Sequence, residues 1–168
     1  MRIVDNAEAI EWLSSRGITD PKGKMLGAGF PRKATYYLPG DSGRKTAIAL
    51  ALGHRLSKFD ESILWIDEWG IWGPCENWPL FYGYRQYLGE TRPTEEAPGH
   101  IFVPSDEDIV FALLSMLYFS WGAVFASSSR ETIRISHDEW VDVYGKDLGV
   151  PENDIFAVAK WFIDEHTE

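Results

Sequence analysis

Hydrophobic positions recur with a helical period in some parts of the chain and with a strand period in others, which predicts both element types. Asn6–Arg16 places Ile10 and Leu13 on one face of a helix. The segment Gly43–Leu56 contains the apolar run AIALAL, and Asp106–Ser120 is apolar on nearly every side. Both of these helices are therefore predicted to be buried on more than one side.

Short apolar or alternating runs predict strands between the helices. Further helices are expected at Pro79–Leu88 and Asp154–Glu165. The stretch Gly89–Pro104 holds three prolines and is expected to be a long loop. The predicted strands are Ala34–Leu38, Ile63–Ile66, Ala123–Ala126 and Thr132–Ser136.

The order of these elements predicts an α/β or α+β fold with a mixed sheet of four or more strands and helices packed on it. A length of 168 residues suits a single globular domain over residues 1–168. Residues 109–129 contain no charged side chain, which raises the question of a membrane span. The segment follows an acidic flank and changes from helical to strand-like sequence near Gly122. A buried helix that leads into a buried strand is the better prediction.

The chain carries a net charge of −10, from 16 basic and 26 acidic residues. This balance argues against nucleic acid as a partner, because phosphates need a basic surface, and it would suit a basic protein partner. The single cysteine, Cys75, excludes an intramolecular disulfide and a cysteine-based zinc site. The acidic N-terminal sequence lacks a signal-peptide core, so a reducing cytoplasm is the expected compartment. No cofactor and no membrane association are expected.

A candidate anion site lies at the start of the helix predicted for Gly43–Leu56. The sequence PGDSGRKT looks like a phosphate loop, but Arg44 and Pro39 occupy the positions where a nucleotide-binding loop needs glycine. What remains is a helix N-terminus with basic and hydroxyl side chains, which can bind an anion. Solvated loop charges beside an ordinary helix cap are the alternative. The candidate anion-binding residues are Ser42, Arg44, Lys45 and Thr46.

A second set of candidate residues is acidic and follows two of the predicted strands. If those strands are neighbours, carboxylates and one imidazole could meet at a sheet edge, which would suit Mg²⁺, Mn²⁺ or acid–base catalysis. The sequence does not give the strand order, and acidic residues also end strands for ordinary reasons. No metal is expected, but the candidates for a metal site or a catalytic role are Asp67, Glu68, His137 and Asp138.

Half of the eight tryptophans fall between Ile63 and Tyr87. Trp65 alternates into a strand and is predicted to be core. The other three lie in or beside a turn rich in glycine and proline, where partly exposed rings could anchor a partner. A small satellite core beneath the proline-rich loop is the alternative. The candidate binding residues are Trp69, Trp72, Trp78, Glu139 and Trp140.

Three segments resemble sequences of small uncharacterised bacterial proteins: DSGRKT, WIDEWGIW, and ISHDEW followed by VDVY. The resemblance spans about Tyr36 to Tyr144. It implies a bacterial, single-domain, cytosolic protein, and it brings no activity, ligand or site residue with it.

Two functions from different classes fit these residues. The first is a non-catalytic protein-interaction domain, for example an immunity-type protein, that binds a basic partner through the acidic Trp-rich turn and the loop around Glu95 and Glu96. The second is a small metal-dependent hydrolase acting on a phosphorylated substrate, with the four acidic-site residues on the metal and Arg44 and Lys45 on the phosphate. A homodimer interface at the aromatic turn is a third possibility.

Overall fold

The computed structural model describes residues 1–19, 33–38, 40, 42–56, 59–68, 78–117, 122–128 and 132–144. The turn at residues 69–77, which includes Trp69 and Trp72, and the predicted helix Asp154–Glu165 lie outside these residues. The helices are α1 (Asn6–Ser15), α2 (Ser42–Leu56), α3 (Trp78–Tyr87) and α4 (Glu107–Leu117), with a 3₁₀ turn, η1 (Pro104–Asp106). The strands are β1 (Arg2–Val4), β2 (Lys33–Tyr37), β3 (Ser62–Glu68), β4 (Gly99–Phe102), β5 (Gly122–Ser127), β6 (Thr132–Ile135) and β7 (Trp140–Tyr144).

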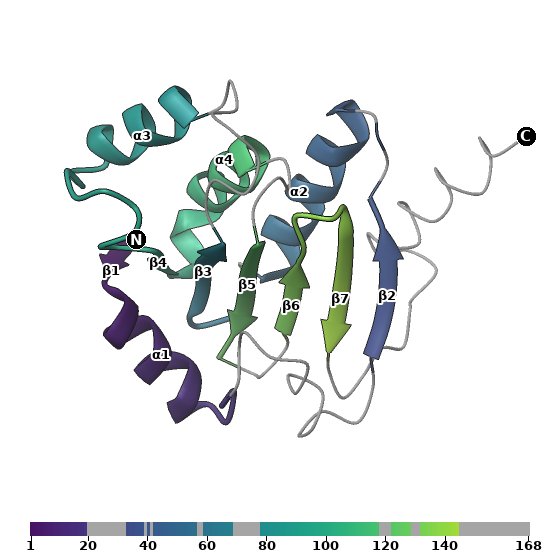
Figure 1. Ribbon diagram of the computed structural model, residues 1–168, viewed down its shortest axis with the longest axis horizontal. Coiled ribbons are helices and arrows are strands. Elements are labelled where there is room, and N and C mark those ends of the chain that lie inside the picture. Colours follow the sequence, from purple (N-terminus) through teal and green to yellow (C-terminus); the bar gives the residue numbers. More distant parts are fainter. Residues whose placement is uncertain are drawn as a thin grey trace, which may run out of the picture.

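The seven strands of the described residues form one sheet in the order β1-β4-β3-β5-β6-β7-β2 (Figure 1). Every pair of neighbouring strands is antiparallel, so the sheet is not mixed as expected. The predicted fold class, a sheet of four or more strands with helices packed on it, is confirmed. Among the two classes left open, the antiparallel pairing corresponds to α+β.

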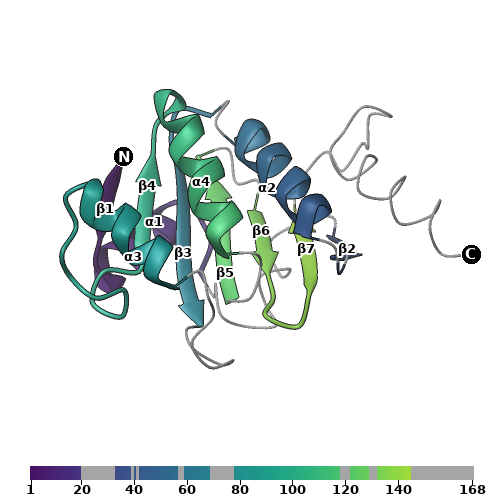
Figure 2. The same ribbon diagram turned by 90° about the horizontal axis from the view of Figure 1, so that it is seen from above.

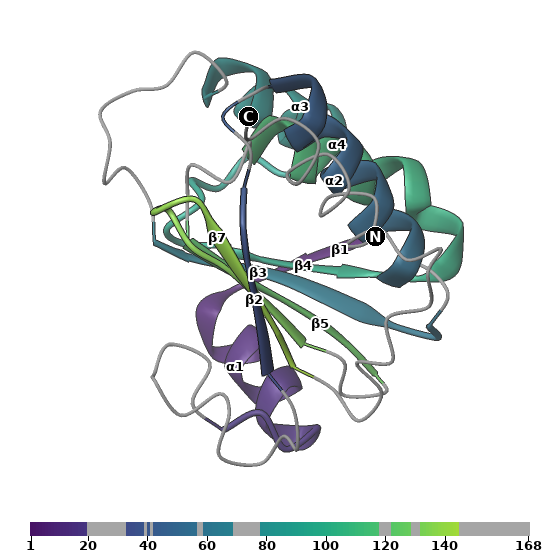
Figure 3. The same ribbon diagram turned by 90° about the vertical axis from the view of Figure 1, so that its right-hand side faces the viewer.

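α2 and α4 each connect strands that are not neighbours in the sheet. β4 and β5 both pair antiparallel with β3, so they run in the same direction, and α4 connects them across β3. α2 connects β2, at one edge of the sheet, with β3. α2 and α4 lie side by side on one face of the sheet (Figure 2). α1 lies on the opposite face (Figure 3).

The sheet is buried on both faces at β3, which explains the unbroken apolar run in its sequence. Leu64 and Ile66 belong to the core beneath α2 and α4. Ile63 and Trp65 alternate with them and belong to the core beneath α1. Trp65 is fully buried, as predicted, and its ring nitrogen donates a hydrogen bond to Asn6 Oδ1 at 3.2 Å.

Three strands, β1, β4 and β7, are absent from the sequence-based prediction. β4 lies inside the predicted loop Gly89–Pro104, where Gly99 and His100 conceal the apolar pattern. All four of its residues are buried, because β4 is paired on both edges and packed on both faces. On β7, Val141 and Val143 belong to the core beneath α2 and α4, and Asp142 lies between them. This acidic residue made the alternating pattern of a strand difficult to recognise in the sequence.

The residues that begin two helices differ from those expected. Asp5 caps α1 in place of Asn6, because its carboxylate accepts the N–H of Glu8 at 2.9 Å. The predicted cap of the Asp106–Ser120 helix, Ser105, lies inside η1 instead. There the carboxylate of Asp106 accepts a hydrogen bond from the backbone N–H of Val103 at 2.9 Å. An aspartate therefore directly precedes each helix, Asp5 before α1 and Asp106 before α4, where its charge suits the positive end of a helix dipole.

The uncharged stretch at residues 109–129 contains most of α4 and all of β5, with residues 118–121 outside the described part. The predicted order of a buried helix followed by a buried strand is confirmed. Within the described ranges, no helix is long and apolar enough to cross a membrane.

Gly99→Ala should destabilise the protein by about 1–3 kcal/mol through overpacking. A Cβ at this position would lie 2.6 Å from Val4 Cγ2 and 2.9 Å from Ala9 Cβ. Gly83→Ala is the matched control, because a Cβ there meets nothing within 4 Å and alanine favours the helix by about 0.5–1 kcal/mol. Urea unfolding measures both variants. Equal effects would contradict the close packing of β1 and α1 against β4.

Candidate functional site

β3 ends in a bulge that places the first acidic pair. Ile66 pairs with Ala123 and Glu68 pairs with Gly122, which leaves Asp67 as an extra residue on β3. A bulge of this kind redirects side chains at the end of a strand. Glu68 lies over Gly122, where an added Cβ would collide with the Glu68 side chain. The bulge and the glycine together set the position of Asp67 and Glu68.

Arg134 of β6 binds this acidic pair across β5. Its Nη1 lies 2.6 Å from Asp67 Oδ1, and its Nη2 lies 3.5 Å from Glu68 Oε2. The Asp67 side chain is 1% exposed and that of Arg134 is 11% exposed, so this is a buried ion pair. Arg134 also lies opposite the buried Asp142 of β7. Asp67 is therefore held inside the sheet by a cation and does not reach the surface.

His137 connects the second acidic segment to the first. Its Nδ1 lies 2.8 Å from Glu68 Oε2, and its Nε2 lies 3.4 Å from Asp138 Oδ1. The side chain of Glu68 is 36% exposed and that of Asp138 is 63% exposed. The acidic residues that end β3 and those that follow β6 therefore meet through Glu68 and His137, although β5 lies between these two strands.

The turn between β6 and β7 holds Glu139 in a left-handed backbone conformation, with φ at 63°. Glu139 N donates to Ser136 O at 3.3 Å, and Ser136 N donates to Trp140 O at 2.9 Å. Asp138 N donates to Ser136 Oγ at 3.1 Å. A left-handed residue other than glycine costs about 1–2 kcal/mol, so these bonds hold the turn against local strain.

Lys45 of α2 binds this same turn. Its Nζ lies 2.7 Å from Glu139 Oε1. The hydroxyl of Thr46 donates to Ser42 O at 2.9 Å, which is a bond within the helix. Ser42 is exposed at the first residue of α2, and the side chain of Arg44 lies outside the described part of the chain. Two of the four candidate anion-binding residues thus have intramolecular partners.

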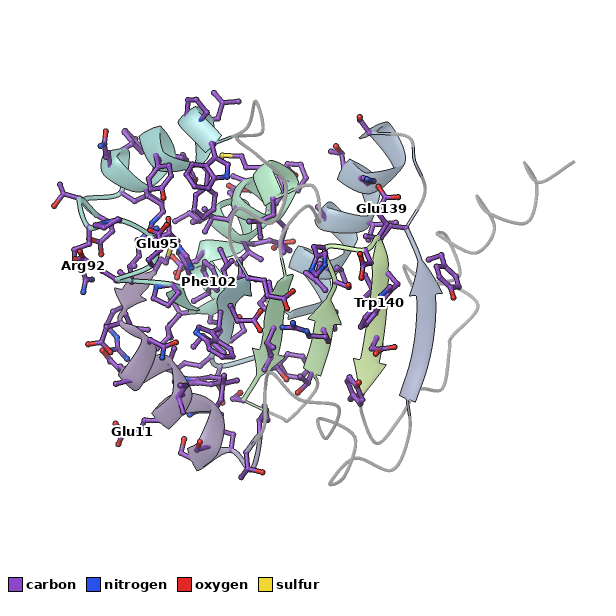
Figure 4. All side chains as sticks on the ribbon, viewed as in Figure 1. Glu11, Arg92, Glu95, Phe102, Glu139 and Trp140 are labelled. Atoms are coloured by element: carbon purple, nitrogen blue, oxygen red, sulfur yellow. The ribbon has the colours of Figure 1, made fainter. Side chains whose placement is uncertain are left out.

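The two candidate tryptophans of the described residues, Trp78 and Trp140, do not lie on one surface. Trp140 of β7 pairs with Tyr37 of β2. Trp140 alternates with Val141 and therefore lies away from the core beneath α2 and α4 (Figure 4). Tyr37 is 72% exposed and Trp140 is half-buried. Trp78 begins α3 and packs against the core beneath α2 and α4, with its ring centroid 5.4 Å from that of Tyr82. Trp78 and Trp140 therefore lie on opposite sides of the sheet.

The loop around Glu95 and Glu96 is also separate from the acidic strand ends. Both glutamates are exposed in the segment between α3 and β4. In Figure 4, Glu95 lies near β4 on the left and Glu139 lies near the start of α2 on the right. Glu95 and Glu139 are therefore well apart. The sequence combined this loop with the acidic Trp-rich turn, most of which lies outside the described residues, so that combination stays a prediction.

Exposed and half-buried groups at this end of the sheet form one surface, which we call the acidic sheet end. Glu68 contacts His137, and His137 in turn contacts Asp138. The backbone N–H of Leu38 donates to the carbonyl of Glu139 at 2.7 Å, which joins β2 to the same turn. The acidic sheet end consists of Tyr37, Glu68, Asp138, Glu139 and Trp140.

The contacts of this region are those of an ion-pair network. The described residues include no group of three or more His, Cys, Asp or Glu side chains that could hold a metal ion. In the hydrolase alternative Asp67 would bind the metal and Lys45 the phosphate. In the structure Asp67 binds Arg134, and Lys45 binds Glu139. These pairs fix the neighbouring carboxylates in position.

Two residues of this region were missed at the level of sequence. Arg134 lies between two apolar residues in IRIS, so strand alternation places it on the face away from α2 and α4. Its pairing with Asp67 needs the strand order, which the sequence does not contain. Tyr37 belongs to a predicted strand, but only the pairing of β2 with β7 places it beside Trp140.

Comparison with known proteins adds no functional assignment. The chain matches no protein-family model, no curated protein and no solved structure. A function has to be argued from the contacts of the acidic sheet end itself.

Arg134→Met should destabilise the protein by about 3–5 kcal/mol, because it leaves the Asp67 carboxylate buried without its cation. The double variant with Asp67→Asn should recover part of this loss. Arg2→Met is the control: Arg2 pairs with Glu8 at the surface, and its loss should change stability by less than about 1 kcal/mol. Chemical denaturation distinguishes them, and similar effects of Arg134→Met and Arg2→Met would contradict a buried ion pair.

Glu139→Gly should stabilise the protein by about 0.5–1 kcal/mol, because glycine adopts a left-handed conformation without strain. The lost contact with Lys45 involves a carboxylate that is 56% exposed and contributes less. Glu139→Gln keeps the strain and removes the charge, so it should be close to neutral. Thermal unfolding compares the two, and a glycine variant no more stable than the glutamine variant would argue against strain at Glu139.

Proposed function

We propose that the protein is a non-catalytic protein-interaction domain that binds a basic protein partner through the acidic sheet end. The observation that carries this proposal is the clustering of three carboxylates, the exposed Asp138 and Glu139 and the partly exposed Glu68, beside the aromatic rings of Tyr37 and Trp140. These groups come from the ends of three strands that are far apart in sequence.

The carboxylates are held in place before any partner arrives. His137 contacts Glu68 and Asp138, and Lys45 contacts Glu139. A surface whose side chains are already ordered loses less conformational entropy on binding. Together with the net charge of −10, the exposed acids would attract a basic partner and orient it during approach.

The aromatic rings supply the apolar part of the proposed interface. Tyr37 and Trp140 are cross-strand neighbours on β2 and β7. Tyrosine and tryptophan offer large contact area with few rotatable bonds, so they often anchor protein interfaces. An acidic rim around two aromatic anchors favours a partner that presents basic side chains around a small apolar patch.

One concrete form of this function is an immunity-type protein that neutralises a basic toxin in the bacterial cytoplasm. A homodimer through the same surface is less favoured, because a two-fold axis would bring the acidic sheet end against a copy of itself. Like charges facing one another weaken such a contact. The proposed cytoplasmic location rests on the single cysteine, Cys75, which excludes an intramolecular disulfide and suits a reducing compartment.

The test is capture of partners from an extract of the native host with immobilised protein, followed by affinity measurement on each captured protein. The triple variant Glu68→Gln, Asp138→Asn and Glu139→Gln should weaken binding of the cognate partner by at least about tenfold, since each rim charge contributes to steering. Salt should weaken the wild-type complex in the same way.

The matched control removes three exposed acids elsewhere: Glu11→Gln, Glu95→Gln and Glu96→Gln. This control changes the net charge by the same amount and should leave the affinity within about twofold of wild type. If the control weakens binding as much as the triple variant, only the overall charge matters and the acidic sheet end is not the interface. A triple variant that keeps every captured partner would also refute the proposal.

A further inference from the structure

A buried arginine lies at the far side of the molecule from the acidic sheet end. Arg85, in the last turn of α3, is 1% exposed. Its Nη2 donates a hydrogen bond to Ala97 O at 2.8 Å, so its guanidinium reaches the turn that precedes β4. Its Cζ lies 5.8 Å from the centroid of the Phe81 ring. The side chain is thus enclosed between α3 and the segment that leads into β4.

Two further buried polar side chains lie in this region. Thr94 belongs to the turn in which Ala97 N donates to Pro93 O, and His100 lies on β4 with its ring centroid 6.0 Å from that of Phe81. Both are completely buried. Among the described residues, four polar atoms of the three side chains have no hydrogen-bond partner: Arg85 Nε, Arg85 Nη1, Thr94 Oγ1 and His100 Nε2.

The positive charge of Arg85 has no carboxylate partner within salt-bridge distance in the part of the chain that the structure describes. The nearest acid that influences it, Glu90, is committed to Arg92 through contacts of 2.6 and 2.9 Å. Hydrogen bonding to Arg92 lowers the pKa of Glu90 to about 2. Burial disfavours the charged guanidinium and therefore lowers the pKa of Arg85. A buried guanidinium in this position lacks one compensating negative charge.

His100 defines which kind of ligand fits beside this cation. Its Nδ1 lies 3.3 Å from the carbonyl oxygen of Leu64, which can only accept, so Nδ1 carries the hydrogen. Burial and the charge of Arg85 lower the pKa of His100 to about 3, against smaller opposing effects from the carbonyls of Leu64 and Pro98. The ring is therefore neutral near pH 7, and its Nε2 is a hydrogen-bond acceptor.

We propose that Arg85, Thr94 and His100 form an internal binding site for a small oxyanion that carries one negative charge and at least one acidic hydrogen, the class to which bicarbonate and dihydrogen phosphate belong. Arg85 supplies the positive charge and N–H donors, and the Thr94 hydroxyl donates to an oxygen of the anion. The O–H of the anion donates to His100 Nε2. A water molecule would satisfy hydrogen bonds but leave the charge of Arg85 uncompensated, and formate or nitrate would offer no hydrogen to His100.

The turn between α3 and β4 forms the covering layer of this site. Pro93, Glu95 and Glu96 of the turn are exposed, whereas Thr94 between them is buried. Figure 4 shows Arg92, Glu95 and Phe102 around this part of the molecule, and Phe102 stacks on His100 with centroids 6.5 Å apart. Local opening of this single turn would admit a small anion without separating α3 from α4.

The test is thermal unfolding of the full chain near pH 7.5 at constant ionic strength, with sodium bicarbonate or sodium phosphate against formate, nitrate and chloride. At about a hundredfold excess over the dissociation constant, bicarbonate or phosphate should raise the midpoint by about 5–10 °C. The two salts distinguish the planar from the tetrahedral anion. Equal shifts with formate or nitrate would overturn the role assigned to the acidic hydrogen, and no shift beyond that of chloride would overturn the site.

Two variants separate specific binding from general salt effects. Thr94→Val removes a hydroxyl that lacks a partner, so its unfolding midpoint in chloride should equal or exceed that of wild type, while the shift caused by the anion should be reduced. Arg85→Met should abolish the shift. If Arg85→Met does not fold, Thr94→Val still decides the question. An unchanged anion-dependent shift in Thr94→Val or in a folded Arg85→Met would refute the proposal.

Discussion

The ion pair between Arg134 and Asp67 joins β6 to β3 across β5, and the arrangement of the acidic sheet end depends on it. A carboxylate that is 1% exposed needs a cation and hydrogen bonds to remain ionised. This requirement fixes the register of β6, since a shift by one residue would turn Arg134 into the apolar core beneath α2 and α4. The same register brings His137 to Glu68, so a buried contact determines which acids remain exposed.

The parts of the fold that could be predicted are those in which one hydrophobic period dominates. The strand in ILWI is present because its alternate residues meet a core on each side. The helix that contains AIALAL is present as well, but it packs on one core through Ile48, Ala49 and Leu52, and Ala47 is exposed, so it is not buried on more than one side as predicted. β4 escaped prediction because Gly99 packs against β1 and α1 without a side chain, and His100 is a polar residue inside an apolar layer. The all-antiparallel strand order follows from packing over long sequence distances, which local periodicity does not report.

The sequence predicted one part of the candidate site, its acidic residues, but not the partners of those residues. Acidic residues at two strand ends, together with His137, marked the place where the segments meet. Their partners could not be inferred, because Arg134 lies 67 residues from Asp67, and Lys45 lies 94 residues from Glu139. Such pairs exist only after the sheet has formed. The interpretation of Lys45 as an anion-binding residue arose from its neighbours in sequence, whereas its contact is with a distant carboxylate.

The largely buried Arg134 and the buried Arg85 show why burial alone does not identify a binding site. Arg134 contacts Asp67 and Glu68, so its charge is compensated inside the protein and its role is to hold the sheet together. Arg85 contacts one carbonyl, leaves two of its nitrogens without partners, and lies beside a carboxylate that is already bound to Arg92. The first arginine completes a network that the chain itself provides. The second has a charge and open donors that no described residue satisfies, and this difference in partners is the reason to assign ligand binding to Arg85 and a structural role to Arg134.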